Sequence, residues 1–202
     1  TGVDQDPARA VELYRKAAEQ GYAPAQCNLG FFYCWGIAVE ENSREAAMWF
    51  AKSAQQGYPR AQQLMGECYE LGRGVEEDLE KAVSLYRAAH EGGYAPGTCS
   101  LGLCYELGRG VEMDKKRAVE LYREAAEAGD IRAQCNLGFC YYQGIGNGNR
   151  RQRGGPLVFR CGGAGLSPGA VPAGGVLPVR LRYGKGPGAG GGAVPGRPRA
   201  AI

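Results

Sequence analysis

The stretch that decides the fold is "LGLCYELGRGVEMDKKRAVELYREAAEAG", residues 101–129. Most of it recurs elsewhere in the chain at a spacing of 36 residues, and no gap is needed for the alignment. The aligned copies are "AVELYRKAAEQGYAPAQCNLGFFYCWG" from Ala10, "AAMWFAKSAQQGYPRAQQLMGECYELG" from Ala46, "AVSLYRAAHEGGYAPGTCSLGLCYELG" from Ala82 and "AVELYREAAEAGDIRAQCNLGFCYYQG" from Ala118. Internal periods of roughly 20–50 residues are typical of solenoids and related arrays. The sequence therefore predicts a repeat protein.

Each repeat predicts two antiparallel helices. The first runs over about residues 78–90 and places small and aromatic residues at i, i+4, i+7 and i+8, which is one helical face. Gly93 follows it and suits the left-handed conformation that ends many helices. The second runs over about residues 95–107 and carries "L-G-x-x-Y". We expect this glycine to let a neighbouring helix approach closely and this tyrosine to fill the gap beside it.

A loop of the form "G-x-G-V-x-x-D" connects one repeat to the next. Its glycines can turn the chain, its valine can anchor the loop, and its aspartate stands where a helix N-cap belongs. One helix pair cannot bury its own apolar face, whereas stacked pairs can. The sequence predicts an all-α fold for residues 1–146, a right-handed α-solenoid of antiparallel helix pairs. The predicted N-caps are Asp6, Asn42, Asp78 and Asp114.

Residues 1–146 resemble the Sel1-like repeat family in both the repeat period and the repeated pattern. The pattern reads "A-x-x-x-Y-x-x-A-A-E-x-G-x-x-x-A-Q-x-x-L-G-x-x-Y-x-x-G-x-G-V-x-x-D". The resemblance implies a superhelical scaffold that binds a protein or peptide partner. It also implies that relatives act as adaptors in membrane-protein degradation, in signalling and in bacterial contacts with host cells. Gly2 and Val3 already belong to a "G-V-x-x-D" loop, so we expect about four repeats that begin and end in mid-repeat, with an N-terminal part missing.

Residues 147–202 differ in composition from the repeats. They contain 9 Arg and Lys, no acid, 16 of the 34 glycines and 7 of the 11 prolines, whereas residues 1–146 carry 15 Lys and Arg against 21 Asp and Glu. Such a segment cannot bury enough apolar surface to offset chain entropy, so it predicts a disordered tail. The net charge of +3 of the whole chain therefore gives no argument for nucleic-acid binding by the repeats.

A frame slip would explain this tail. Codons for residues 153–166 can be chosen so that reading one base later gives "EAVRWYFAAAEQG", in register with the earlier repeats. We therefore hypothesise that residues 147–202 are an out-of-frame translation of a fifth repeat, which sequencing of the coding DNA would test. The alternative is an RNA-binding tail of the RGG type. It is disfavoured because only one RGG is present, and we expect no nucleic-acid partner.

No active site can be assembled from the sequence. A β-lactamase-like site needs S-x-x-K, and no serine here has a lysine three residues on. The lone histidine, His90, replaces an alanine of the other repeats, which favours a packing residue over a catalytic base. "G-R-G" lacks the rest of a phosphate-binding loop. The acidic run at residues 76–78 specifies no ring of metal-ligating oxygens. We expect no enzymatic activity, no cofactor and no metal.

The eight cysteines contain no C-x-x-C pair, so neither a zinc site nor a disulfide framework is predicted. Buried free thiols in a reducing compartment are expected, which favours the cytoplasm. Because we expect an N-terminal part to be missing, a secreted or periplasmic location is the alternative. The alternative is a secreted cysteine-rich relative with β-lactamase-like or penicillin-binding activity. It is disfavoured because Cys27 and Cys34 share one repeat while Cys68 stands alone in the next.

No run of about 18 apolar residues is present, so no membrane span is expected.

Binding is the remaining function, and the positions that vary between repeats indicate where it occurs. By resemblance, the second helices line the concave side of the solenoid. Apolar residues there could anchor a peptide or helix, or they could pack between repeats. The asparagines there could bind a partner backbone or remain hydrated. The predicted concave binding residues are Asn28, Phe31, Trp35, Glu67, Leu103, Asn136 and Phe139.

Overall fold

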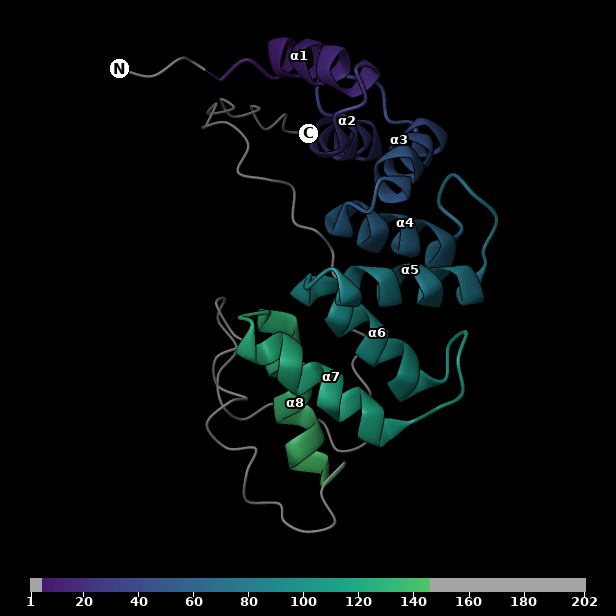
Figure 1. The fold of residues 1–202 in the computed structure, drawn as a ribbon, viewed down its shortest axis with the longest axis vertical. Coiled ribbons are helices and arrows are strands. Elements are labelled where there is room, and N and C mark those ends of the chain that lie inside the picture. Colours follow the sequence, from purple (N-terminus) through teal and green to yellow (C-terminus); the bar gives the residue numbers. More distant parts are fainter. Residues whose placement is uncertain (1–4, 146–202) are drawn as a thin grey trace, which may run out of the picture. The chain divides into compact units, whose positions relative to one another are not determined.

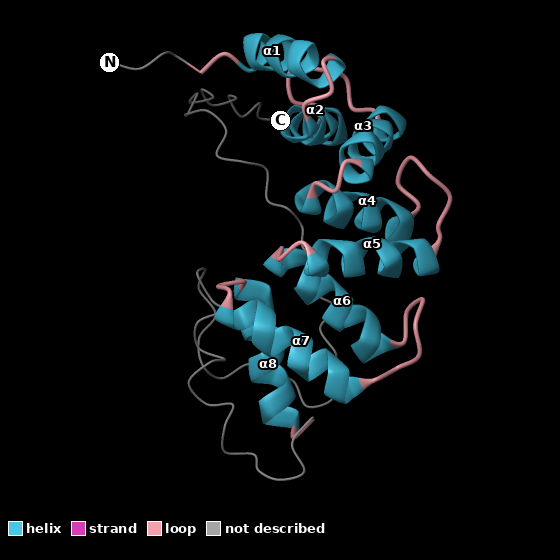
Figure 2. Cartoon of the chain, viewed as in Figure 1, coloured by secondary structure: helices cyan, strands magenta, loops and turns pink. Residues whose placement is uncertain are grey.

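The structure is a computed structural model that describes residues 5–145. Within this range the chain forms helices and no strands, which confirms the predicted all-α solenoid (Figures 1 and 2). The tail and its frame-slip hypothesis lie outside the described residues. The helices are α1 (Pro7–Glu19), α2 (Ala23–Trp35), α3 (Ser43–Gln55), α4 (Pro59–Leu71), α5 (Leu79–Glu91), α6 (Ala95–Leu107), α7 (Lys115–Glu127) and α8 (Ile131–Gln143).

The first helix of each pair begins at a side-chain cap, as the sequence predicts. Asp78 accepts a hydrogen bond from the backbone N–H of Lys81 at 2.9 Å, and Asp114 accepts from the backbone of Lys116 and Arg117 at 3.0 Å. Such caps satisfy amide groups that have no partner inside the helix. Asp6 and Asn42 cap α1 and α3 in the same way.

Left-handed residues turn the loops between repeats. Gly72 and Gly74 have φ angles of +63° and +72°. A Cβ at Gly74 would lie 2.0 Å from the backbone oxygen of Ser43, so the loop packs directly on the start of α3. The first loop has alanine at the corresponding position, and Ala38 adopts a φ of +57°, which is unfavourable for any residue with a Cβ.

A glycine in each second helix makes room for an aromatic ring. A Cβ on Gly66 would lie 2.6 Å from Cε1 of Tyr86, which belongs to the first helix of the next repeat. The prediction that the tyrosine of "L-G-x-x-Y" fills this gap is therefore wrong, because Tyr69 lies on the same helix and is only partly buried. Gly30 and Phe50 form the same contact, as do Gly102 and Tyr122.

These contacts join one repeat to the next. Tyr86 is fully buried, and its hydroxyl donates a 2.6 Å hydrogen bond to Glu70 of α4. Tyr122 makes the same bond to Glu106 of α6. Burial and the neighbouring carboxylate raise the pKa of both phenols. The core thus runs across repeat boundaries, which is the nearest-neighbour cohesion expected of a solenoid.

Three of the second helices, α4, α6 and α8, lie nearer to one another than the first helices do. Helix α4 contacts α6, and α6 contacts α8, whereas no two first helices make comparable contacts in the described part of the chain. This spacing is the one expected when α4, α6 and α8 occupy the inner side of a curved stack.

Candidate functional site: the second-helix face

All seven predicted binding residues lie on the second helices α2, α4, α6 and α8. We use "second-helix face" for the surface that Asn28, Phe31, Trp35, Glu67, Leu103, Asn136 and Phe139 form together with Arg60 and Arg132. Large apolar groups on it are open to solvent. The exposed fraction is 38% for Trp35, 37% for Leu103 and 46% for Phe139. Each of these three side chains therefore keeps more than a third of its surface accessible to solvent.

The α2 end of this face combines two aromatic rings with a cation. The rings of Phe31 and Trp35 lie 6.0 Å apart, and Phe31 also packs against the core around α3. The guanidinium of Arg60, from the next second helix, lies 6.0 Å from the Phe31 ring centre. Its Nη1 donates to Oδ1 of Asn28 at 3.5 Å. This end of the face therefore offers apolar area and positive charge side by side.

The middle of the face holds a carboxyl group that is poorly solvated. Glu67 accepts a 2.5 Å hydrogen bond from Nε2 of Gln63 on the same helix. Burial raises the pKa of Glu67, and the Arg132 guanidinium and the hydrogen bond from Gln63 partly oppose this. The Glu67 carboxylate is thus held by a hydrogen bond from its own helix and does not project freely towards a binding partner.

The α8 end is tied to α6 by polar contacts. Asn136 donates from Nδ2 to Sγ of Cys99 at 3.8 Å. Arg132 donates from Nη2 to the carbonyl oxygen of Pro96 at 3.2 Å and pairs with Asp130 at 3.8 Å. Asn28 and Asn136 therefore each use part of their hydrogen-bonding capacity within the protein. Phe139, with 46% of its surface exposed, is the apolar member of the second-helix face at this end.

Two functional candidates, Arg60 and Arg132, were missed by the sequence reasoning. They occupy one repeat position, where the other repeats have Pro24 and Pro96. The signal was available in the 36-residue alignment, because a position that alternates between proline and arginine is not constrained by packing. What could not be read from the alignment is that both side chains reach across to the neighbouring second helix.

His90 is arranged for packing between repeats. Its Nδ1 lies 3.1 Å from Oγ1 of Thr98 and 3.4 Å from Oε1 of Glu124. A catalytic triad engages the nucleophile and the carboxylate through different ring nitrogens, whereas here both neighbours approach the same one. Thr98 is also buried, with 3% of its surface exposed, so its hydroxyl is closed to substrate.

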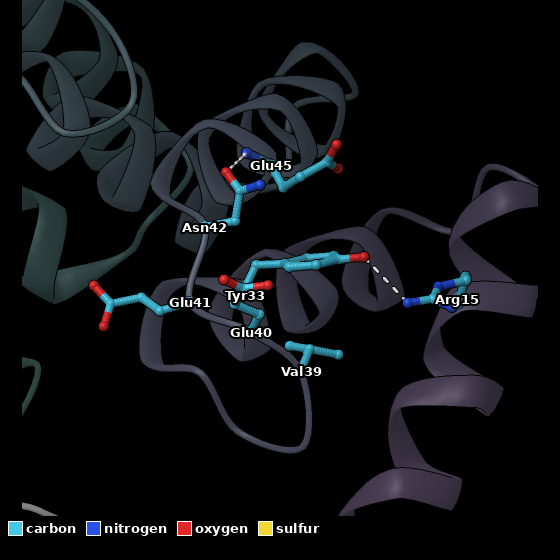
Figure 3. Close-up of a pocket in the computed structure, with 7 residues that line it drawn as sticks. All are labelled: Arg15, Tyr33, Val39, Glu40, Glu41, Asn42 and Glu45. Atoms are coloured by element: carbon cyan, nitrogen blue, oxygen red, sulfur yellow. Dashed lines mark hydrogen bonds between the residues drawn. The ribbon is translucent and has the colours of Figure 1, made fainter.

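A pocket of about 520 Å³ lies outside the second-helix face, next to the first long loop (Figure 3). Nη2 of Arg15 donates to the hydroxyl of Tyr33 at 3.1 Å on one side of it. Glu45 and Tyr33 line this pocket. At the equivalent positions 36 residues later, Nζ of Lys81 lies 5.4 Å from the ring centre of Tyr69, so a cation replaces the carboxylate there. The lining residues are Arg15, Tyr33, Val39, Glu40, Glu41, Asn42 and Glu45, so the pocket is acidic.

Most of the cysteines that the structure describes are buried thiols. Cys34 is the half-buried member of this group, and Cys135 differs because it is disulfide-bonded, so the expectation of free thiols is wrong at that position. Burial raises the pKa of Cys34, of Cys27 to about 11, and of Cys68, Cys99, Cys104 and Cys140 to about 12. These six thiols are therefore protonated at neutral pH and poorly nucleophilic.

Neither a clustered metal site nor a spanning helix occurs in the described part of the chain. Residues 5–145 contain no group of three or more His, Cys, Asp or Glu side chains that could hold a metal ion. Within the same residues, no helix has the length and apolar character needed to cross a membrane.

Comparison with known proteins identifies the repeat. The family model of the Sel1 repeat matches residues 1–22, 23–58, 59–94, 95–130 and 131–150, so three matches have the full 36 residues. No curated protein matches the chain.

Solved structures share both fold and sequence with this chain. A Sel1 repeat protein from Oxalobacter formigenes is 36% identical, with a TM-score of 0.74, over 79% of this chain and 64% of that protein. A protective antigen of uropathogenic Escherichia coli with an SLR fold is 38% identical, with a TM-score of 0.67, over 72% of this chain and 31% of that protein. Cysteine-rich protein B of Helicobacter pylori is 25% identical, with a TM-score of 0.50, over 63% of this chain and 96% of that protein.

This chain therefore spans less than two thirds of the length of the first two structures. The repeat matches cover more than half of it and agree in register with the helices described above. The chain belongs to the Sel1 repeat family.

Proposed function

We propose that this chain is a non-catalytic adaptor that binds a protein or peptide partner through its second-helix face. Proteins built of Sel1 repeats are generally scaffolds for protein–protein interactions. The observation that carries the proposal is the exposure of Trp35, Leu103 and Phe139 on one set of helices. Apolar and aromatic anchors of this kind contribute most of the affinity in protein interfaces.

The environment of His90 supports a role without catalysis. The raised pKa values of the six free thiols support it as well, since the thiolate is the reactive form of cysteine. The rival cysteine-rich hydrolase class pairs its cysteines. Counting of thiols under denaturing, non-reducing conditions separates the two: if six to all eight of the cysteines react as free thiols, the adaptor and a reducing location are favoured, whereas none or two free thiols would favour the rival.

The test uses peptides selected from a random phage-displayed library against the folded chain, with affinities measured by fluorescence anisotropy. Leu103→Asp and Phe139→Asp should each weaken binding by about 10- to 100-fold, because burying one such side chain contributes about 1.5–3 kcal/mol. The matched controls are Leu13→Asp and Met48→Asp, which change exposed apolar residues on first helices α1 and α3.

The proposal predicts that only the second-helix variants lose affinity. If the first-helix variants lose affinity and the second-helix variants do not, the binding surface has been assigned to the wrong side of the stack.

A further inference from the structure

Arg60 indicates which kind of peptide the second-helix face binds. The side chain is partly buried, yet no described carboxylate forms an ion pair with it. By contrast, Arg109, Arg117 and Arg132 are each paired with an acidic side chain. Within residues 5–145, Arg60 contacts the neutral amide of Asn28 and the ring of Phe31 instead.

These two contacts orient the guanidinium without using up its hydrogen-bonding capacity. A guanidinium has five N–H donors, and the bond to Asn28 takes one of them at 3.5 Å, which is long for a hydrogen bond. The Phe31 ring, whose centre lies 6.0 Å from the guanidinium carbon, attracts the cation and favours some orientations of it over others. An arginine held in this way is suited to donate two parallel hydrogen bonds to a carboxylate.

The surroundings of Arg60 are apolar on the side of α2. The Trp35 ring, 6.0 Å from Phe31, is 38% exposed, and Leu71, one repeat later at the position of Trp35, is 51% exposed. A ligand that places a negative charge at Arg60 would therefore also lay apolar groups on these side chains.

The charge of the domain argues against a long polyanion. Residues 5–145 carry 15 Lys and Arg against 20 Asp and Glu, a net charge of −5. A nucleic acid would be repelled by this domain as a whole, whereas a short peptide with one carboxylate can pair locally with Arg60.

We propose that the α2–α4 end of the second-helix face binds a peptide segment with a carboxylate that pairs with Arg60 and with an apolar residue that packs on Phe31 and Trp35. This proposal rests on the proposed function and specifies the chemistry of the partner. The carboxylate could belong to an Asp or Glu side chain or to a peptide C-terminus, and the test separates these two sources.

The experiment uses three fluorescein-labelled pools of randomised nonapeptides that lack Asp and Glu at the random positions. One pool has a fixed central Glu and an amidated end, the second a fixed central Gln and an amidated end, and the third a central Gln and a free carboxyl end. We expect the Glu pool or the free-acid pool to bind about tenfold more tightly than the amidated Gln pool. This preference should shrink as NaCl rises from low to physiological concentration.

Two variants remove the charge preference by different routes. Arg60→Gln deletes the cation, and Asn28→Asp places a carboxylate beside it that competes with the peptide. Both should abolish the tenfold preference, yet Asn28→Asp adds an ion pair and should not lower the melting temperature. A loss of preference in both variants therefore cannot be attributed to misfolding. Arg87→Gln, at an exposed position of first helix α5, is the matched control and should keep the preference.

Several results would overturn the proposal. Equal binding of all three pools, or a preference that survives Arg60→Gln, would remove Arg60 as the anion-binding group. Tighter binding of a single-stranded RNA oligonucleotide than of any peptide pool would replace the peptide with a nucleic acid. Binding that is insensitive to charge but lost in Phe139→Asp would overturn this inference and leave the proposed function intact, whereas no binding of any pool would overturn both.

Discussion

Replacing Gly66 by alanine should destabilise the protein, although alanine favours helices more than glycine does. In an exposed helix interior the substitution would stabilise by about 1 kcal/mol. Here the new Cβ would lie 2.6 Å from Cε1 and 2.8 Å from Cδ1 of Tyr86, about 1 Å closer than an ordinary contact. The ring cannot move freely, because Tyr86 is fully buried and its hydroxyl is bound to Glu70 at 2.6 Å. Overpacking of this kind costs about 1–3 kcal/mol.

We therefore expect a net loss of up to about 2 kcal/mol in the free energy of unfolding, measured by urea denaturation with circular dichroism at 222 nm. Ser84→Ala, on the exposed side of α5, is the control and should change the free energy by less than about 0.5 kcal/mol. In a Tyr86→Leu background, which removes the ring, Gly66→Ala should become neutral or stabilising. A stabilising effect of Gly66→Ala in the wild-type background would refute the packing argument.

Three further predictions test individual features of the fold. Tyr122→Phe removes the hydroxyl that donates to Glu106 at 2.6 Å, and it should cost about 1.5–3 kcal/mol in urea unfolding. Ala38→Gly relieves a left-handed alanine with a φ of +57°, and it should raise the melting temperature by a few degrees; an unchanged or lower value would argue against strain there. Stability should fall as the pH rises from about 8.5 towards 12, because buried thiols such as Cys104 keep a folded pKa of about 12 while the unfolded thiols ionise near 8.5. Cys104→Ala should reduce this slope by about 1.4 kcal/mol per pH unit, and an unaltered slope would show that Cys104 does not contribute.

The order of the helices could be predicted from the sequence because the same capping residues, glycines and apolar positions recur in each repeat. The predicted second helix over residues 95–107 agrees with α6 at both ends, and the predicted first helix over residues 78–90 differs from α5 by one residue at each end. Local signals sufficed here: Asp78 can cap a helix through its own side chain, and Gly93 adopts the left-handed conformation expected of it, with a φ of +72°.

The contacts between repeats could not be predicted in the same way. The sequence places a glycine and an aromatic residue in every repeat, but it does not show that the ring against Gly66 comes from Tyr86 and not from Tyr69. Likewise, the reach of Arg60 to Asn28 depends on the angle between two helices and on a long flexible side chain. Such pairings are set by tertiary geometry, which periodicity does not specify.

The most direct test of the central claim, that the second helices bind the partner, is a map of where a bound peptide protects the backbone. Hydrogen–deuterium exchange of the whole chain would be compared with and without the tightest peptide from the phage selection. The account predicts that added protection falls on α2, α4, α6 and α8, strongest near Arg60 and Phe31. Protection confined to the first helices, or to the acidic pocket at Arg15 and Glu45, would contradict it.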